Sequence, residues 1–308
     1  FSMIDLSGRV AIVTGAGGGL GREHALLLAK RGAKVVVNDL GGSVTGEGAS
    51  QNAAEKVVDE IRSLGGDAIA NAASVTDVSA VEEMVSDALK RWGKVDILIN
   101  NAGILRDKTF SKMSLDEFRF VLDVHLMGAV HCTKAVWELM KSQSYGRIVM
   151  TTSSSGLYGN FGQSNYGAAK LALVGLMQTL ALEGAKYNVR VNCLAPTAGT
   201  RMLDGLMPDA MLEALHPSAV SPGMLALVAD NAPTRAILCA GAGSFEQAHI
   251  TMTRGIYAGL GEEAAETISA NWSSISDRTD EIVPASGSVQ GQVELQKAGF
   301  DASTLQGA

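Results

Sequence analysis

Short apolar runs and longer amphipathic segments alternate along the first 240 residues. The apolar runs predict buried strands at residues 10–13, 35–37, 69–73, 95–99, 147–152 and 189–194. The segments between them predict helices at residues 22–30, 52–64, 78–92, 115–140 and 166–183. Buried strands that alternate with helices are typical of a parallel sheet covered on both faces. The pattern therefore predicts an α/β fold with a Rossmann-type, doubly wound parallel sheet.

The alternation weakens after Pro196. Residues 199–222 predict a loop with short helices, and their methionines and leucines suit either a substrate lid or ordinary packing. Residues 224–229 predict a helix and residues 235–240 a last strand. The more polar residues 256–308 predict a C-terminal extension, helical around 262–272 and looser at 284–291. We therefore expect one domain over residues 3–255, with a lid at about 199–222, followed by the extension.

Composition narrows the classes of function. The net charge of −7, without a basic run, argues against nucleic-acid binding. The three cysteines show no spacing of a disulfide framework or zinc site, so we expect reduced thiols and no metal. No apolar run approaches the roughly 18 residues of a membrane span, and no signal peptide is evident. The sequence thus predicts a cytoplasmic protein that acts on a small molecule.

A glycine-rich turn follows the first predicted strand. Gly15, Gly19 and Gly21 permit close backbone approach to a ligand, and the following helix offers free N–H groups to a pyrophosphate. Asp39 ends the second strand, where a carboxylate can accept both ribose hydroxyls and repel a 2′-phosphate. The combination predicts a dinucleotide site that prefers NAD.

Tyr166 and Lys170 form a candidate proton-transfer pair. Their i, i+4 spacing places both on one face of a predicted helix. A nearby ammonium favours the phenolate, so we expect Lys170 to lower the pKa of Tyr166. Ser153, at a strand end, can hold the reacting oxygen; we prefer it to Ser154 and Ser155 on its spacing from the tyrosine.

Three histidines have less specific interpretations. His24 follows two charged residues at the start of a helix, and we expect it at the surface. His125 and His131 lie on the long predicted helix, where packed or solvent-facing roles are the common ones.

These motifs together resemble the short-chain dehydrogenase/reductases over roughly residues 5–255. The matching segments are Thr14-Gly15-x-x-x-Gly19-x-Gly21, Asn100-Asn101-Ala102-Gly103, Tyr166-x-x-x-Lys170 and Pro196-Thr197-Ala198-Gly199-Thr200. The resemblance implies that Tyr166 is the acid/base, that Lys170 binds the nicotinamide ribose and that Ser153 orients the substrate. It implies NAD contacts from Gly15, Gly19, Leu20, Gly21, Asp39, Ser74, Val75, Asn101, Ala102, Gly103, Tyr166, Lys170, Pro196, Ala198 and Thr200.

A narrower resemblance is to the (3R)-hydroxyacyl-CoA dehydrogenase unit of peroxisomal multifunctional enzyme type 2. It rests on residues 35–42, 156–166 and 195–202, on the extended segment 41–50 and on Ala270-Asn271-Trp272. It implies oxidation of a fatty or steroid side-chain (3R)-hydroxyacyl-CoA in β-oxidation, by a stand-alone bacterial relative that forms a homodimer or homotetramer. A 17β-hydroxysteroid dehydrogenase acting on free steroid alcohols and a catalytically silent NAD-binding module remain the alternatives.

Two positions depart from the wider family. His125 replaces the usual helix asparagine of the proton relay, and Ser74 replaces the usual aspartate at the adenine-binding strand end. The departures affect details of the site rather than the reaction type.

Overall fold

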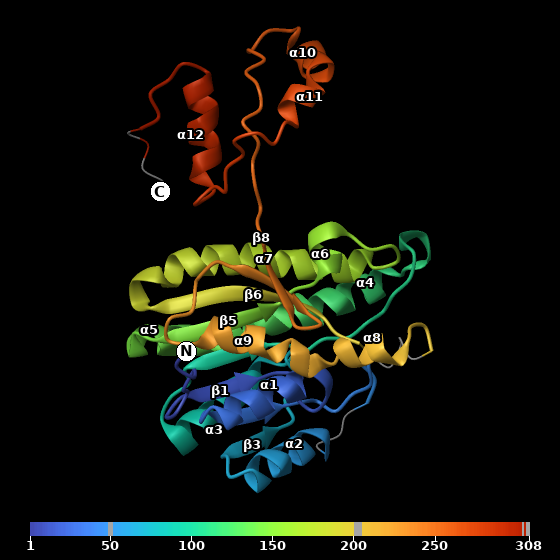
Figure 1. Cartoon of the computed structure of the whole chain (residues 1–308), viewed down its shortest axis with the longest axis vertical. Helices are drawn as coiled ribbons and strands as arrows, with labels where there is room; N and C mark the ends of the chain where they lie inside the picture. Colours follow the sequence, from blue (N-terminus) through green and yellow to red (C-terminus); the bar gives the residue numbers. More distant parts are fainter. Residues whose placement is uncertain (49–51, 200–204, 304, 306–308) are drawn as a thin grey trace. The chain divides into compact units, whose positions relative to one another are not determined.

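A computed structural model describes residues 1–48, 52–199, 205–303 and 305. It divides into two compact units, Phe1–Gln247 and Ala248–Ala308 (Figure 1). The boundary that the sequence predicts, after residue 255, stays a prediction. The centre of the predicted lid, residues 200–204, lies outside the described residues.

The first unit is built on an eight-stranded sheet in the order β3-β2-β1-β4-β5-β6-β7-β8. Every registered strand pair from β1 to β7 is parallel, and the order reverses direction on either side of β1 and β4. The predicted fold class is thereby confirmed. The strands are β1 Val10–Val13, β2 Lys34–Asn38, β3 Ala68–Asn71, β4 Ile97–Asn100, β5 Gly146–Thr151, β6 Val189–Thr197, β7 Ile237–Gly241 and β8 Ser244–Ala248.

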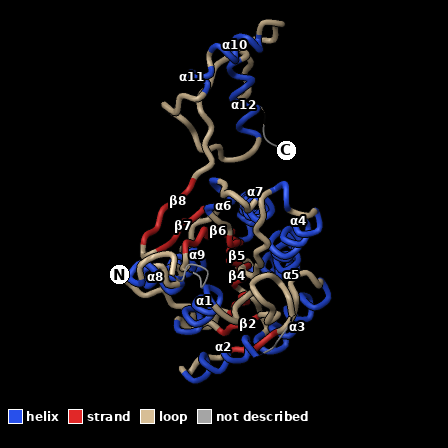
Figure 2. Tube along the Cα trace, turned by 90° about the vertical axis from the view of Figure 1, so that its right-hand side faces the viewer, coloured by secondary structure: helices blue, strands red, loops and turns tan. Residues whose placement is uncertain are grey.

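Helices cover the sheet on both faces (Figure 2). Helices α1, α2 and α9 pack together on one face, and α3, α4, α5 and α7 form the other layer. The helices of this unit are α1 Gly19–Lys30, α2 Asn52–Ser63, α3 Val78–Trp92, α4 Leu115–Leu122, α5 Gly128–Gln143, α6 Ser154–Tyr158, α7 Ser164–Gly184, α8 Asp209–Ala214 and α9 Ser221–Val228.

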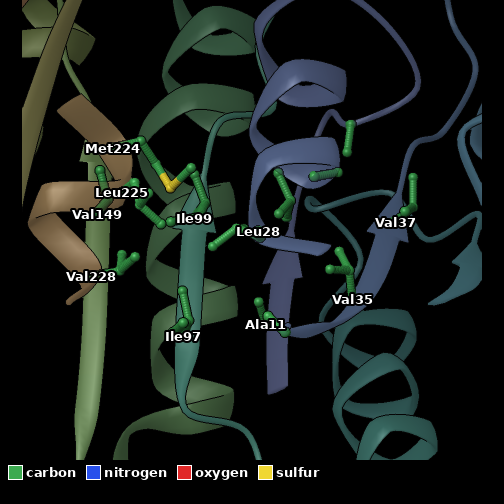
Figure 3. Close-up of a cluster of buried hydrophobic side chains, with 14 of the residues drawn as sticks. Ala11, Leu28, Val35, Val37, Ile97, Ile99, Val149, Met224, Leu225 and Val228 are labelled. Atoms are coloured by element: carbon green, nitrogen blue, oxygen red, sulfur yellow. The ribbon is translucent and has the colours of Figure 1, made fainter. Parts of the chain in front are cut away.

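The core beneath α1 and α9 shows why the strands are apolar throughout (Figure 3). Ile97 and Ile99, alternate residues of β4, point to the same face, where they lie near Leu28 of α1 and Met224 of α9. All four side chains are fully buried. Burying a side chain of this size contributes about 2 kcal/mol, so this layer fixes the sheet against α1.

The first unit also holds a helix long and apolar enough to cross a membrane, Ser164–Tyr187, the one such segment among the described residues. It lies against β6, and its buried side chains include Ala169, Leu173 and Met177. This packing is that of a core helix.

Several predicted elements differ from the structure. The single helix expected over 115–140 is α4, a π-helical turn at Asp123–Met127, and α5. The sheet does not end at residue 240, because Ala242 and Gly243, both with positive φ, connect β7 to the neighbouring strand β8. A two-residue connection of this kind makes an antiparallel hairpin. His24, expected at the surface, is fully buried.

The second unit contains α10 Ala264–Ala270, α11 Trp272–Ile275 and α12 Ser288–Lys297. An antiparallel bridge joins Met252 to Ile282. The looser segment predicted at 284–291 is therefore partly wrong, because α12 begins within it.

Candidate active site

The motifs that the sequence singled out meet at the carboxyl ends of the central strands. The glycine turn follows β1, Asn101 follows β4, Ser153 follows β5, and Pro196 lies at the end of β6. Ligands of open parallel sheets bind at this edge, beside the point where the strand order reverses.

The glycine turn is closely packed on one side and open on the other. A Cβ on Gly15 would lie 2.8 Å from the Ala102 Cα, and one on Gly21 only 2.2 Å from the Gly15 carbonyl oxygen. Gly18 and Gly19 have open space instead. Gly18 caps α1 without a side-chain hydrogen bond, so the first N–H groups of the helix face that space. This turn fits the pyrophosphate of a dinucleotide.

Asn101 ties the end of β4 to the turn. Its Nδ2 donates to the carbonyl oxygens of Thr14 (3.3 Å) and Gly15 (3.2 Å). The Thr14 hydroxyl in return accepts from the backbone N–H groups of Asn101 and Ala102, at 3.0 Å each. Because these bonds join the same two loops, Asn101 holds the glycine turn in place, and its contact with NAD stays a prediction.

Asp39 lies beside the glycine turn. One carboxylate oxygen accepts from the Gly17 N–H (2.8 Å) and the other from the Gly41 N–H (2.6 Å). The carboxylate is half-buried at the end of β2. Its position and acceptor chemistry fit the ribose hydroxyls of a dinucleotide.

The other predicted cofactor contacts are more scattered. The Ser74 hydroxyl bonds the Thr76 hydroxyl (2.7 Å), and the Val75 carbonyl bonds His131 Nδ1 (2.8 Å). Leu20 and Ala198 are half-buried against the core of α1 and α9. Thr200 lies outside the described residues.

Tyr166 and Lys170 lie in the first turns of α7, with Ser153 opposite. The Lys170 Nζ lies 5.5 Å from the centroid of the Tyr166 ring and donates to the Thr151 carbonyl oxygen at 2.7 Å. Ser153 lies close enough to the Tyr166 phenol to lower its pKa. Ser153 also caps the short helix α6, because its hydroxyl accepts from the Ser155 N–H at 3.1 Å. The structure thus brings the three predicted catalytic residues together.

Burial controls the electrostatics of this trio. It raises the pKa of Tyr166, against a smaller downward effect of Ser153, and Asp107 raises it further. Burial also lowers the pKa of Lys170 to about 7. The pKa of Tyr166 is therefore raised, whereas Lys170 was expected to lower it, because burial is the largest influence on this phenol.

His125 is a further member of the site. Its Nε2 lies 2.7 Å from the Ile104 carbonyl oxygen, and its ring meets the Tyr166 ring edge-on, with 5.2 Å between centroids. Burial lowers its pKa to about 3, so the imidazole is neutral. A Cβ on Gly103 would lie 2.3 Å from the His125 Cε1, so only glycine fits beside this ring.

A small cavity of about 10 Å³ lies beside His125 and Lys170. Three buried polar atoms without a protein partner belong to residues that line it: Asn100 Oδ1, His125 Nδ1 and Thr151 Oγ1. A cavity of this size and polarity suits one water molecule. Sequence analysis missed Asn100 and Thr151 as members of the site, because their side chains converge only in three dimensions.

Among the described residues, no group of three or more His, Cys, Asp and Glu side chains is placed to hold a metal ion.

Comparisons with known proteins identify the family of this chain. The family model described as short chain dehydrogenase matches residues 9–209. Peroxisomal multifunctional enzyme type 2 of Drosophila melanogaster is 57% identical over 215 residues, which cover 70% of this chain and 36% of that protein. Its solved full-length structure superposes with a TM-score of 0.78 at 38% identity, covering 97% of this chain and 52% of that one. This chain therefore spans only part of that relative.

Two further proteins are similar over most of their own length. A short-chain type dehydrogenase/reductase of Mycobacterium tuberculosis is 48% identical over 270 residues, 87% of this chain and 94% of that protein. The structure of 7α-hydroxysteroid dehydrogenase complexed with NADH and 7-oxo glycochenodeoxycholic acid has a TM-score of 0.69 at 30% identity, covering 78% of this chain and 95% of that one.

Proposed function

This chain belongs to the short-chain dehydrogenase family and is a dehydrogenase that uses a nicotinamide dinucleotide, and from that premise we propose that it oxidises a (3R)-hydroxyacyl-CoA with NAD. The observation that carries the proposed chemistry is the convergence of Tyr166, Ser153 and Lys170 at the sheet edge that holds the glycine turn, with the Lys170 Nζ 5.5 Å from the centroid of the Tyr166 ring. An acid/base, an orienting hydroxyl and a cation are the groups that proton transfer at a secondary alcohol requires.

The protein's own residues move and hold the proton. The ionised Tyr166 oxygen takes the hydroxyl proton of the alcohol while Ser153 donates a hydrogen bond to the same substrate oxygen. A nicotinamide dinucleotide held by the glycine turn and Asp39 would supply the acceptor for the hydride that leaves the substrate carbon as the carbonyl forms. Lys170 favours the phenolate form, since an ammonium near a phenol stabilises its anion.

The preference for NAD rests on Asp39. Its carboxylate is held by two backbone N–H groups next to the turn, so a 2′-phosphate at this place would meet a negative charge. We expect Asp39→Ala to lower the ratio of kcat/KM for NAD to that for NADP by roughly tenfold or more, because two like charges about 4 Å apart near a protein surface repel by roughly 1 to 4 kcal/mol. Steady-state kinetics with both cofactors measure the ratio, and an unchanged ratio contradicts the assignment.

The acid/base role is tested by Tyr166→Phe, with Tyr187→Phe as the matched loss of a hydroxyl at the far end of the same helical segment. We expect the first variant to lose turnover by roughly a thousandfold or more and to bind NADH as before, because the ring stays and only the proton donor is removed. Turnover by Tyr166→Phe close to that of Tyr187→Phe would refute the proposal.

The substrate class is supported by the similarity to peroxisomal multifunctional enzyme type 2 over 70% of this chain. A hydroxysteroid dehydrogenase is the second candidate, favoured by the likeness to 7α-hydroxysteroid dehydrogenase. NADH formation with short, long and steroidal (3R)-hydroxyacyl-CoAs, and with free steroid alcohols, separates the two. Higher kcat/KM for free steroids than for every thioester would favour the second candidate.

The remaining proposals concern assembly and the substrate lid. Helices α5 and α7 are proposed to form the interface of a homodimer or homotetramer, and Leu171 and Leu182 on α7 are about half exposed, as an unpaired interface requires. Residues 199–222 are proposed to cover the substrate. Sedimentation that shows only monomers would refute the first of these.

A further inference from the structure

The first turn of α7 lacks the usual cap. The helix begins at Ser164, and its N-cap residue Gln163 makes no side-chain capping bond. Four N–H groups at a helix start have no partner within the helix. The first N–H that finds one is that of Gly167, which donates to the Gln163 carbonyl oxygen at 2.7 Å. The N–H of Tyr166, just before it, depends on a partner from elsewhere.

That partner is the neighbouring side chain of Asn165. Its Oδ1 accepts from the Tyr166 N–H at 2.7 Å. Its Nδ2 donates to the Arg106 carbonyl oxygen at 3.1 Å. Asn165 is fully buried, so water cannot replace either bond. One carboxamide therefore joins the tyrosine's backbone to the loop of residues 104–106.

The loop of residues 104–106 is itself held at three places. The Ile104 backbone bonds His125, the Leu105 N–H donates to the Val44 carbonyl oxygen at 2.9 Å, and Arg106 Nε donates to the Thr45 carbonyl oxygen at 3.1 Å. The Arg106 guanidinium also lies 4.6 Å from the centroid of a phenylalanine ring of α4. The segment that follows Asp39 thus braces the loop, and the loop anchors the start of α7.

We propose that Asn165 is a positioning residue, which fixes the Tyr166 hydroxyl within reach of Ser153 by tying the first turn of α7 to residues 104–106. The proposal rests on the proposed role of Tyr166 as acid/base. Without the carboxamide, the Tyr166 N–H is left unsatisfied in a buried place, and the turn relaxes to satisfy it. A displacement of about 1 Å at a reacting group can cost roughly a hundredfold in rate.

The test compares Asn165→Ala with Asn192→Ala. Asn192 is equally buried and makes the same kind of bonds. Its Nδ2 donates to the Pro233 carbonyl oxygen (2.8 Å), and its Oδ1 accepts from the Ala236 N–H (2.9 Å). It lies within β6, away from the carboxyl ends of the strands where the site lies. Both variants therefore lose a buried carboxamide with matched contacts, but only Asn165 bonds Tyr166 in the parent protein.

We expect Asn165→Ala to lower kcat by roughly 10- to 100-fold with KM for NAD within twofold. The acid limb of the kcat profile should move to higher pH, because a displaced tyrosine moves away from Ser153, which lowers the pKa of Tyr166. The near-isosteric Asn165→Asp keeps the acceptor and the packing but cannot donate to Arg106 when ionised. It should also lower kcat and shift the limb by roughly one pH unit, since its charge opposes the phenolate.

Asn192→Ala should leave both kcat and the acid limb near those of the parent. Equal losses of kcat in the two alanine variants, or an unmoved acid limb in both Asn165 variants, would overturn the proposal. The Tyr166→Phe variant tests the acid/base role independently of the positioning role. If that variant keeps full turnover, the acid/base assignment fails; if it is inactive while Asn165→Ala behaves like Asn192→Ala, only the positioning role fails.

Discussion

A buried histidine between α1, the helix that follows the glycine turn, and α9 should make folding stability depend on pH. His24 lies on α1 and is fully buried; its Nδ1 bonds the Ser221 hydroxyl at 2.8 Å, and its Nε2 has no protein partner. Burial alone lowers the pKa of His24 from 6.5 to about 3. The folded protein therefore keeps this ring neutral at pH values where the unfolded chain takes up a proton.

The sign and size of the effect follow from this difference. Because the folded-state pKa lies below the unfolded value, the stability is complete above about pH 6.5 and is lost progressively as the pH falls toward about 3. Between pH 7.5 and pH 5.0, proton uptake by the unfolded chain at this one histidine costs about 2 kcal/mol of unfolding free energy.

The assay is urea unfolding at the two pH values for the parent and for His24→Asn. Asparagine can keep a bond to Ser221 but does not titrate. We expect the pH-dependent loss of stability to be smaller by about 2 kcal/mol in this variant, because all other titrating groups contribute equally to both proteins. His249→Asn, at an exposed position, should leave the loss unchanged. Equal losses in the parent and in His24→Asn would refute the reasoning.

Two further predictions also follow from buried contacts. Gly103→Ala places a Cβ 2.3 Å from the His125 Cε1, so the imidazole ring beside Tyr166 must shift, and we expect kcat to fall by roughly a hundredfold. The control Gly291→Ala, where the added Cβ has open space, should not change kcat. Arg147 is almost fully buried and donates to the carbonyl oxygens of Gly146, Asn188, Ala229 and Asp230. Arg147→Met should lose roughly 3 kcal/mol or more of unfolding free energy, against little loss for Arg62→Met, which makes one such bond at the surface.

The strands of the sheet were predictable because a parallel sheet buries both of its faces. Each residue of β1 and β4 is buried, so an uninterrupted apolar run marks the strand. The edge strand β8 lacks this signal, since four of its five residues are exposed and three of the five are polar. Because an exposed edge strand leaves no apolar run in the sequence, the predicted sheet ended one strand too early.

The wrong prediction for His24 has a different cause. His24 follows Arg22 and Glu23, and these polar neighbours favoured a surface position. Its partner at i+4 is the fully buried Leu28, and that helical spacing was the signal that places His24 on the buried face. The π-helical turn around His125 leaves no comparable trace, because one extra residue in a turn barely changes the apolar periodicity of a long helix.

The candidate site divides in the same way. Motif spacing predicted Ser153, Tyr166 and Lys170, because the ends of strands and the starts of helices meet at one edge of the sheet. Asn165 lies within residues 156–166, which carry the narrower resemblance, but its bond to the Arg106 carbonyl oxygen could not be predicted, since Arg106 is 59 residues away in sequence. Contacts of that kind follow from the path of a loop, which periodicity does not describe.

The spacing of Tyr166 and Lys170 also led to a wrong prediction of the direction in which the pKa of Tyr166 shifts. Proximity to Lys170 predicted a lower tyrosine pKa, yet both groups are buried, and desolvation opposes the charged form of each. Among the described residues, the Lys170 ammonium donates to the Thr151 carbonyl oxygen, and the Tyr166 ring and the Cys193 thiol lie near it. Burial raises the pKa of Cys193 and keeps that thiol neutral, so a phenolate at Tyr166 would be the anion beside the ammonium, and ionisation of one group favours the charged form of the other. The acid limb of turnover should then belong to the pair rather than to the tyrosine alone, and its position reports how firmly α7 holds the two side chains together.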